Sequence, residues 1–99
     1  MRPIHVVGLD KARPVLILTR ELARPHLSEV TVAPITTRIR GLSTEVPLDA
    51  ANGLSAPSVV NCDNIATISV DALGNQIGVL LDRQEPLLSL AIQAAFDLD

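Results

Sequence analysis

The stretches ARPVLIL (residues 12–18) and VAPITT (residues 32–37) decide the fold that this sequence predicts. Each is a short run of aliphatic and β-branched residues with polar side chains at its end, which is typical of a β-strand. Proline cannot donate to a strand ladder, so Pro14 and Pro34 are expected at a strand start, an edge or a bulge. The two runs therefore place an arginine, Arg13, and a threonine, Thr36, where they can converge on an anionic group at the lip of a small barrel.

Similar runs continue along the chain and are separated by Gly, Pro, Asn and Asp. The pairs Asn52-Gly53 and Gly74-Asn75 are turn signals. Short strands with this punctuation favour a small barrel or sandwich, and the chain has the length of a single domain, residues 1–99. The predicted strands cover residues 4–9, 14–19, 30–37, 45–48, 58–67 and 76–79.

The C-terminal segment is predicted to be the only helix. Apolar residues recur there at helical spacing, and Asp82 or Gln84 is a candidate cap before Glu85 and Pro86 in the first turn. The fold class predicted is thus mainly β with a C-terminal helix. The apolar stripe of this helix consists of Leu88, Ala91, Ile92 and Ala95. We expect this stripe to pack on the barrel, or partly in a dimer interface.

Composition excludes several classes of function. Phe96 is the one aromatic residue, so a platform of aromatic side chains for stacked bases is not available, and arginine, histidine and backbone groups would have to hold any RNA. No apolar run approaches the roughly 18 residues of a membrane span, and the N-terminal apolar run is too short for a signal peptide. The single cysteine, Cys62, suits a reducing cytoplasm and is expected to be a small buried residue rather than a reactive thiol.

Charge is unevenly distributed along the chain, whose net charge is -3. Seven basic and three acidic residues precede Gly41, whereas one basic and eight acidic residues follow from there onward. Two readings stay open from the sequence: a basic patch for an anionic ligand, or strands that mix so that the asymmetry averages out.

The residues that carry chemistry point away from metals and cofactors. His5, His26 and Cys62 show no metal-ligand spacing, and the glycines form no phosphate loop, so we expect neither a metal nor a nucleotide cofactor. RNA supplies its own nucleophile, the 2′-hydroxyl, and an enzyme can cleave it by orienting that group and stabilising phosphoryl charge. Arg13 and Thr36 suit this task, although an arginine solvating a loop and an ordinary strand threonine would leave the same pattern.

Taken in order, the motifs resemble those of the MazF family of toxin ribonucleases. RPVLI (13–17) is similar to the run in which an arginine opens the second strand and binds the scissile phosphate. APITT (33–37) resembles the next strand, whose Thr or Ser after the isoleucine is the second catalytic residue. RGLSTEV (40–46) and SVVNCDNIATI (58–68) resemble the following hairpin and a long strand, where Asp63 and Asn64 occupy positions that contact bases.

The resemblance implies an SH3-like barrel of the MazF/CcdB toxin fold, with Arg13 and Thr36 as catalytic residues. It implies a cytoplasmic homodimer that cuts single-stranded RNA at a short sequence, leaving 2′,3′-cyclic phosphate and 5′-hydroxyl ends. A MazE-like antitoxin with a disordered acidic tail would be its partner. The expected RNA-binding residues are Asp10, Lys11, His26, Thr37, Arg38, Arg40, Asp63 and Asn64.

Two departures from the family pattern bear on specificity. Residues 9–12 make the first connection in four residues, which resembles the short-loop actinobacterial branch, and Asn64 stands in place of Gln. His26 either contacts RNA or is a structural loop residue. The rival functions are a non-catalytic gyrase poison like CcdB, whose C-terminal Trp this chain lacks, and a plain interaction barrel.

Overall fold

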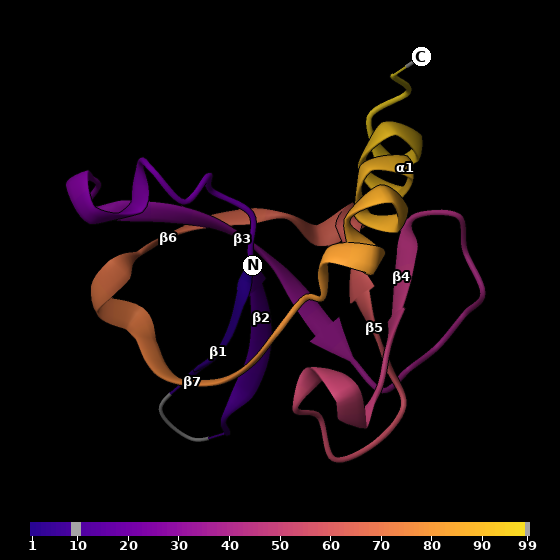
Figure 1. Cartoon of the computed structure of the whole chain (residues 1–99), viewed down its shortest axis with the longest axis horizontal. Helices are drawn as coiled ribbons and strands as arrows, with labels where there is room; N and C mark the ends of the chain where they lie inside the picture. Colours follow the sequence, from indigo (N-terminus) through magenta and orange to yellow (C-terminus); the bar gives the residue numbers. More distant parts are fainter. Residues whose placement is uncertain (9–10, 99) are drawn as a thin grey trace.

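The computed structural model describes residues 1–8 and 11–98. In this part of the chain, seven strands precede one α-helix, and short 3-10 turns connect several of them (Figure 1). The strands are β1 (Pro3–Val7), β2 (Arg13–Ile17), β3 (Glu29–Thr36), β4 (Glu45–Leu48), β5 (Ser58–Asn61), β6 (Ala66–Ser69) and β7 (Leu73–Val79), and the helix is α1 (Glu85–Ala95).

The strands form one antiparallel sheet in the order β4-β5-β3-β2-β1-β7, with β6 also paired to β3. β6 lies on one edge of the β1–β2–β3 unit and β7 on the other, and the 3-10 turn η4 (Val70–Ala72) joins them. The chain therefore curls round from one edge to the other, as the wide orange curve of Figure 1 shows. Among the described residues the hydrogen-bonded ladder does not close, so the predicted barrel is a curled sheet.

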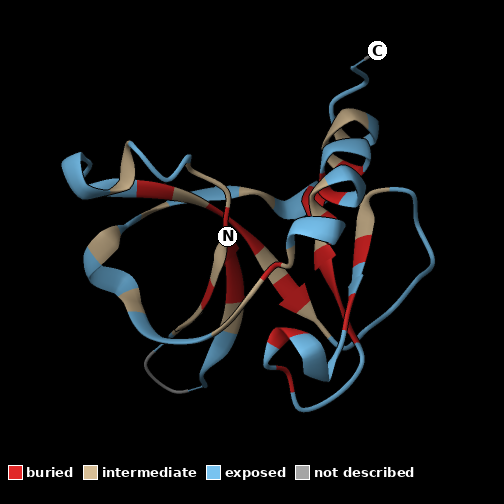
Figure 2. Ribbon diagram, in the orientation of Figure 1, coloured by how far each residue is buried: buried red, intermediate tan, exposed pale blue. Residues whose placement is uncertain are grey.

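Successive side chains of the central strands alternate between two hydrophobic cores on opposite faces of this sheet. Figure 2 marks in red the buried residues, which concentrate along these strands and on the inner side of α1. Leu16 and Ile4 point to the larger core, which α1 covers with Leu88 and Ala91. The neighbouring side chains on the other face fill the inside of the curl: Val15, Ile17, Val30 and Val32, with Val7, Ile68, Val70 and Leu73 against them. Strands that bury both faces read as continuous apolar runs, which explains the two stretches that decide the fold.

Five of the six predicted strands are confirmed, with ends within three residues of those expected. The predicted strand 58–67 is wrong in one respect, because the 3-10 turn η3 (Cys62–Asn64) divides it into β5 and β6. The Asn61 side chain accepts a hydrogen bond from the Asp63 N–H at 2.9 Å, which turns the backbone out of the strand. The turn predicted at Gly74-Asn75 is also wrong, since both residues lie within β7.

Helix α1 begins at Glu85 with Pro86 in its first turn, as predicted, but neither candidate side chain caps it. Asp82 opens a 3-10 turn, and the Gln84 side chain is buried against Asn52 instead. Asn52 Nδ2 donates to Gln84 Oε1 at 2.7 Å, and Gln84 Nε2 donates back to Asn52 Oδ1 at 3.3 Å. This pair ties the turn after β4 to the start of the helix. No helix in the described ranges is long and apolar enough to cross a membrane.

Candidate functional site

The start of β2 and the end of β3 bring the two predicted catalytic residues to one end of the sheet. β2 and β3 pair with Val15 opposite Pro34, and continuing this antiparallel register by two residues places Arg13 opposite Thr36. Residues directly opposite in an antiparallel pair project from the same face. Val15 points into the curl, so Arg13 and Thr36 lie on the same inner face. They stand at the end of the curl where β2 begins and β3 ends, which we call the mouth.

Thr36 is half-buried and its hydroxyl is held by the loop that follows. The Arg38 backbone N–H donates to Thr36 Oγ1 at 3.1 Å. That contact uses a lone pair of the oxygen and leaves the hydroxyl proton available to a ligand. The backbone of Thr36 pairs with Val59 of β5, which fixes its position from the other edge of β3. The threonine is thus oriented as a donor toward the mouth.

A groove of about 200 Å³ lies beside Thr36. Two predicted RNA-binding arginines, Arg38 and Arg40, line it, and so does Asn64 from η3. Its other lining residues are Pro34, Thr36, Glu45 and Asn61. Arg13 does not line this groove but stands exposed at the start of β2.

The arginines of this region have no carboxylate partner in the described part of the chain. The one ion pair found there joins Arg2 to Glu85, and the guanidinium groups of Arg13, Arg38 and Arg40 make no hydrogen bond to another described residue. An unpaired guanidinium presents its whole fork of donors to a phosphate group. The region is therefore suited to an anionic ligand.

Two groove residues, Glu45 and Asn61, were missed by the sequence reasoning. They lie directly opposite each other where β4 begins and β5 ends. The Glu45 carboxylate accepts hydrogen bonds from the backbone N–H groups of three successive residues, Arg40 to Leu42. The sequence did contain a signal for Glu45: an acidic residue at the start of a predicted strand, shortly after Gly41. An acidic side chain in such a position often accepts hydrogen bonds from the backbone of the adjacent turn.

Asp63 is exposed beside the groove and is oriented by its neighbours. The Thr44 hydroxyl donates to Asp63 Oδ2 at 2.7 Å, which leaves the carboxylate with acceptor capacity for a ligand. Cys62, next to it, is buried as predicted, and burial, with a smaller effect of the Asp63 charge, raises the pKa of its thiol to about 11. Such a thiol stays protonated near neutral pH and is not a nucleophile.

The remaining predicted residues are not gathered at the groove. Thr37 follows Thr36 and is exposed, and Lys11 is exposed in the connection before β2. Asp10 lies outside the described residues. His26 ends the 3-10 turn η1 (Arg24–His26) before β3, so it is separated from Thr36 by the length of an eight-residue strand, roughly 23 Å. Its RNA contact stays a prediction, and the groove does not include it.

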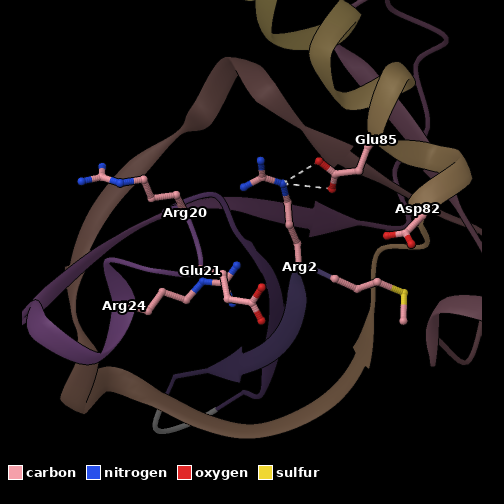
Figure 3. Close-up of a pocket in the computed structure, with 7 residues that line it drawn as sticks. Arg2, Arg20, Glu21, Arg24, Asp82 and Glu85 are labelled. Carbon is pink, nitrogen blue, oxygen red and sulfur yellow. Dashed lines mark hydrogen bonds and ion pairs between the residues drawn. The ribbon is translucent and has the colours of Figure 1, made fainter.

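A second cavity of about 310 Å³ lies at the opposite end of β2 (Figure 3). Arg2 Nε donates to both carboxylate oxygens of Glu85, at 3.1 and 3.0 Å, and Arg2 also donates to the Leu18 carbonyl. Arg24 Nε donates to the Thr19 carbonyl at 2.9 Å, and Figure 3 shows Arg20 pointing away from the Arg2–Glu85 pair. The cavity therefore holds charges of both signs, and Arg2 links the end of β2 to α1 through Leu18 and Glu85.

Comparison with known proteins extends this description. Residues 6–96 match the model of the PemK-like, MazF-like toxins of type II toxin–antitoxin systems. Endoribonuclease MazF3 of Mycobacterium tuberculosis is 71% identical over 99 residues, which are the whole of this chain and 96% of that protein. The structure of the Mycobacterium tuberculosis toxin MazF-mt6 is 70% identical, with a TM-score of 0.95 over 99% of both chains. A mycobacterial endoribonuclease in complex with its cognate antitoxin is 26% identical, with a TM-score of 0.86 over 98% of this chain and 93% of its own.

The curled sheet and its C-terminal helix thus match the fold of small bacterial toxins of known structure. The chain belongs to the PemK-like, MazF-like toxin family of type II toxin–antitoxin systems. The predicted family is confirmed. The expectation of a toxin endoribonuclease holds over that of a non-catalytic gyrase poison.

Proposed function

We propose that this toxin cleaves single-stranded RNA at the mouth of the curled sheet, with Arg13 and Thr36 as its catalytic residues. The observation that supports this assignment is the β2–β3 register, in which Val15 pairs with Pro34; continued by two residues, it sets Arg13 opposite Thr36 on one face. The groove beside Thr36 is lined by Arg38, Arg40 and Asn64, and the RNA chain would run along it. Exposed arginines without carboxylate partners then bind the backbone, while Asp63 and Asn64 contact bases.

The reaction uses the nucleophile that RNA carries. The 2′-oxygen attacks the adjacent phosphorus and loses its proton, the bond from phosphorus to the 5′-oxygen breaks, and the 5′-oxygen gains a proton. The two ends are a 2′,3′-cyclic phosphate and a 5′-hydroxyl, and no water is consumed. Arg13 stabilises the charge on the phosphoryl oxygens, and the Thr36 hydroxyl donates to the same group. Neither role requires a metal or a cofactor.

Three further properties belong to the same proposal. The protein works in the cytoplasm as a homodimer, in which exposed apolar side chains of the C-terminal segment, Leu90, Phe96 and Leu98, are covered. Its partner is a MazE-like antitoxin whose acidic, disordered tail competes with RNA for the unpaired arginines. The complex of the mycobacterial relative with its cognate antitoxin supports such a partner.

The test is cleavage of a long single-stranded RNA in EDTA with both new ends mapped. Wild-type protein is expected to give discrete cuts that end in cyclic phosphate, and Arg13→Ala and Thr36→Ala are expected to abolish them. Arg20→Ala is the matched control, because Arg20 lines the second cavity. RNA left intact by the wild-type protein, or cut equally by Arg13→Ala, contradicts the proposed site.

A further inference from the structure

The loop between β3 and β4 carries both groove arginines on a backbone that one side chain holds. Glu45 Oε1 accepts from the Gly41 N–H at 2.8 Å, from the Leu42 N–H at 3.1 Å and from the Arg40 N–H at 3.2 Å. The Glu45 N–H donates in turn to the Leu42 carbonyl at 3.1 Å. A carboxylate oxygen that accepts three successive backbone N–H groups fixes the loop as a concave nest.

Glycine at position 41 makes this arrangement possible. Its φ of +74° lies in the left-handed region, which turns successive N–H groups toward one point. The loop is exposed from Thr37 to Ser43, and its side chains make no hydrogen bond to the rest of the described chain. Its backbone conformation therefore depends on Glu45 at one end, through the carboxylate and the N–H bond to the Leu42 carbonyl, and on the bond from the Arg38 N–H to Thr36 Oγ1 at the other.

From this geometry we infer that Glu45 is a positioning residue for RNA binding, which holds the Arg38–Leu42 backbone so that Arg38 and Arg40 line the groove. The inference rests on the proposed function, since it takes RNA as the ligand. An ordered loop binds more tightly because the ordering of its long side chains and backbone is already complete before the ligand arrives. Glu45 does not touch the reacting atoms.

Trypsin tests directly whether Glu45 holds the loop backbone in place, which we call the clamp. Trypsin cuts after Arg and Lys unless proline follows, and it cuts an open loop faster than an ordered one. Three of the eight basic residues, Arg2, Arg13 and Arg24, precede proline, so five bonds remain cleavable. Those after Arg38 and Arg40 lie in the loop, and those after Lys11, Arg20 and Arg83 lie outside it; the bond after Arg20 serves as the internal reference. In Glu45→Ala, nicking after Arg38 and Arg40 relative to Arg20 is expected to rise at least about tenfold, because cleavage follows the population of the open loop.

Measurements of RNA affinity distinguish a positioning role of Glu45 from a catalytic one. With the cleaved sequence made as 2′-O-methyl RNA, which cannot supply the nucleophile, Glu45→Ala is expected to raise Kd about tenfold. On normal RNA its KM rises by a similar factor while kcat changes less than about threefold. Glu45→Gln keeps the length and one acceptor oxygen, so it is expected to recover most of the protection and affinity. Glu85→Ala, which removes a carboxylate distant from the groove, is the matched control.

The outcomes are distinct. Unchanged nicking and unchanged Kd in Glu45→Ala overturn the inference, as does a loss in kcat with Kd unchanged, which would place Glu45 at the reacting atoms. If Glu45→Ala does not fold, Glu45→Leu decides, because leucine keeps much of the side-chain bulk and removes both acceptor oxygens. Nicking and Kd identical to wild type in Glu45→Leu overturn the inference. Wild-type protein that leaves RNA intact overturns the proposed function alone, while the trypsin ratio still decides the clamp.

Discussion

At the scale of single residues, Thr36 combines a fixed oxygen with a free proton. Its oxygen accepts from the Arg38 N–H, so substitution by valine removes both this contact and the donor while keeping the shape. We expect Thr36→Val to lower the single-turnover cleavage rate on the order of 100- to 1,000-fold, as for other lost transition-state donors, and Thr36→Ser to stay within about tenfold of wild type. Single-turnover kinetics in EDTA measure both, and equal loss in the two variants would exclude the hydroxyl as the active group.

Cys62 makes the stability of the protein depend on pH in the alkaline range. Burial raises the pKa of its thiol from the reference value of 9.0 to about 11. Between these values the unfolded chain binds fewer protons than the folded one, so the free energy of unfolding falls as pH rises, by at most about 1.4 kcal/mol per pH unit from this group.

Denaturant unfolding of wild type and Cys62→Ala between pH 8 and 11 checks this expectation. The variant lacks the thiol, so its free energy of unfolding should fall less steeply, while all other groups titrate in both proteins. Parallel curves would contradict a buried, protonated thiol. In the folded protein, an alkylating reagent at pH 8 should react far more slowly with Cys62 than with a free thiol.

Sequence reasoning reached some of these residues and not others for a physical reason. Arg13 and Thr36 stand at the ends of strongly apolar runs, so their location follows from local pattern and strand pairing. Glu45 acts through backbone N–H groups of a loop, and such contacts depend on the φ of Gly41 rather than on residue spacing. The sequence makes His26 a candidate because imidazole side chains can contact RNA or move protons near neutral pH, whereas its place before the start of β3, far from Thr36, follows only from the path of that strand.

At the scale of elements, tertiary contacts overrode two local signals. Gly74 was read as a turn residue, but it lies in β7 where β1 passes close by: a Cβ at Gly74 would come within 3.0 Å of Val6 Cγ2. A glycine in a strand often marks such a close approach rather than a turn. The break between β5 and β6 arises from a side-chain bond by Asn61, which hydrophobic periodicity cannot report.

Helix α1 allows a matched test of the larger core. Leu88 is 2% exposed within that core, whereas its neighbour Leu87 is 47% exposed. Leu88→Ala is expected to lower the free energy of unfolding by about 2–5 kcal/mol, through lost burial and a residual cavity. Leu87→Ala is expected to change it by less than about 0.5 kcal/mol in the monomer. Urea unfolding measures both, and equal effects would contradict the packing of α1 described above.

At the scale of the whole molecule, the charge asymmetry of the sequence divides between two places. Arg13, Arg38 and Arg40 stand without carboxylate partners at the mouth. Arg2, Arg20 and Arg24 line the second cavity instead, together with the acidic residues Glu21, Asp82 and Glu85. The folded chain thus places charges of both signs at the second cavity, where Arg2 pairs with Glu85, and leaves the side chains of Arg13, Arg38 and Arg40 without an ion pair among the described residues. A protein of net charge -3 can bind a polyanion only where such a local excess survives.

This division predicts how RNA binding responds to salt. Each phosphate neutralised on a single strand contributes about -0.7 to the slope of log K against log salt concentration, so three arginines give a slope of roughly -2. We expect Arg38→Gln or Arg40→Gln to weaken binding of 2′-O-methyl RNA and to reduce the magnitude of that slope by about 0.7, because each removes one phosphate contact. Arg20→Gln should leave the slope unchanged, since Arg20 belongs to the second cavity. Titrations at several salt concentrations give the slopes directly. Equal changes in Arg20→Gln and Arg40→Gln would mean that RNA responds to net charge alone, and the groove would lose its assignment as the RNA path.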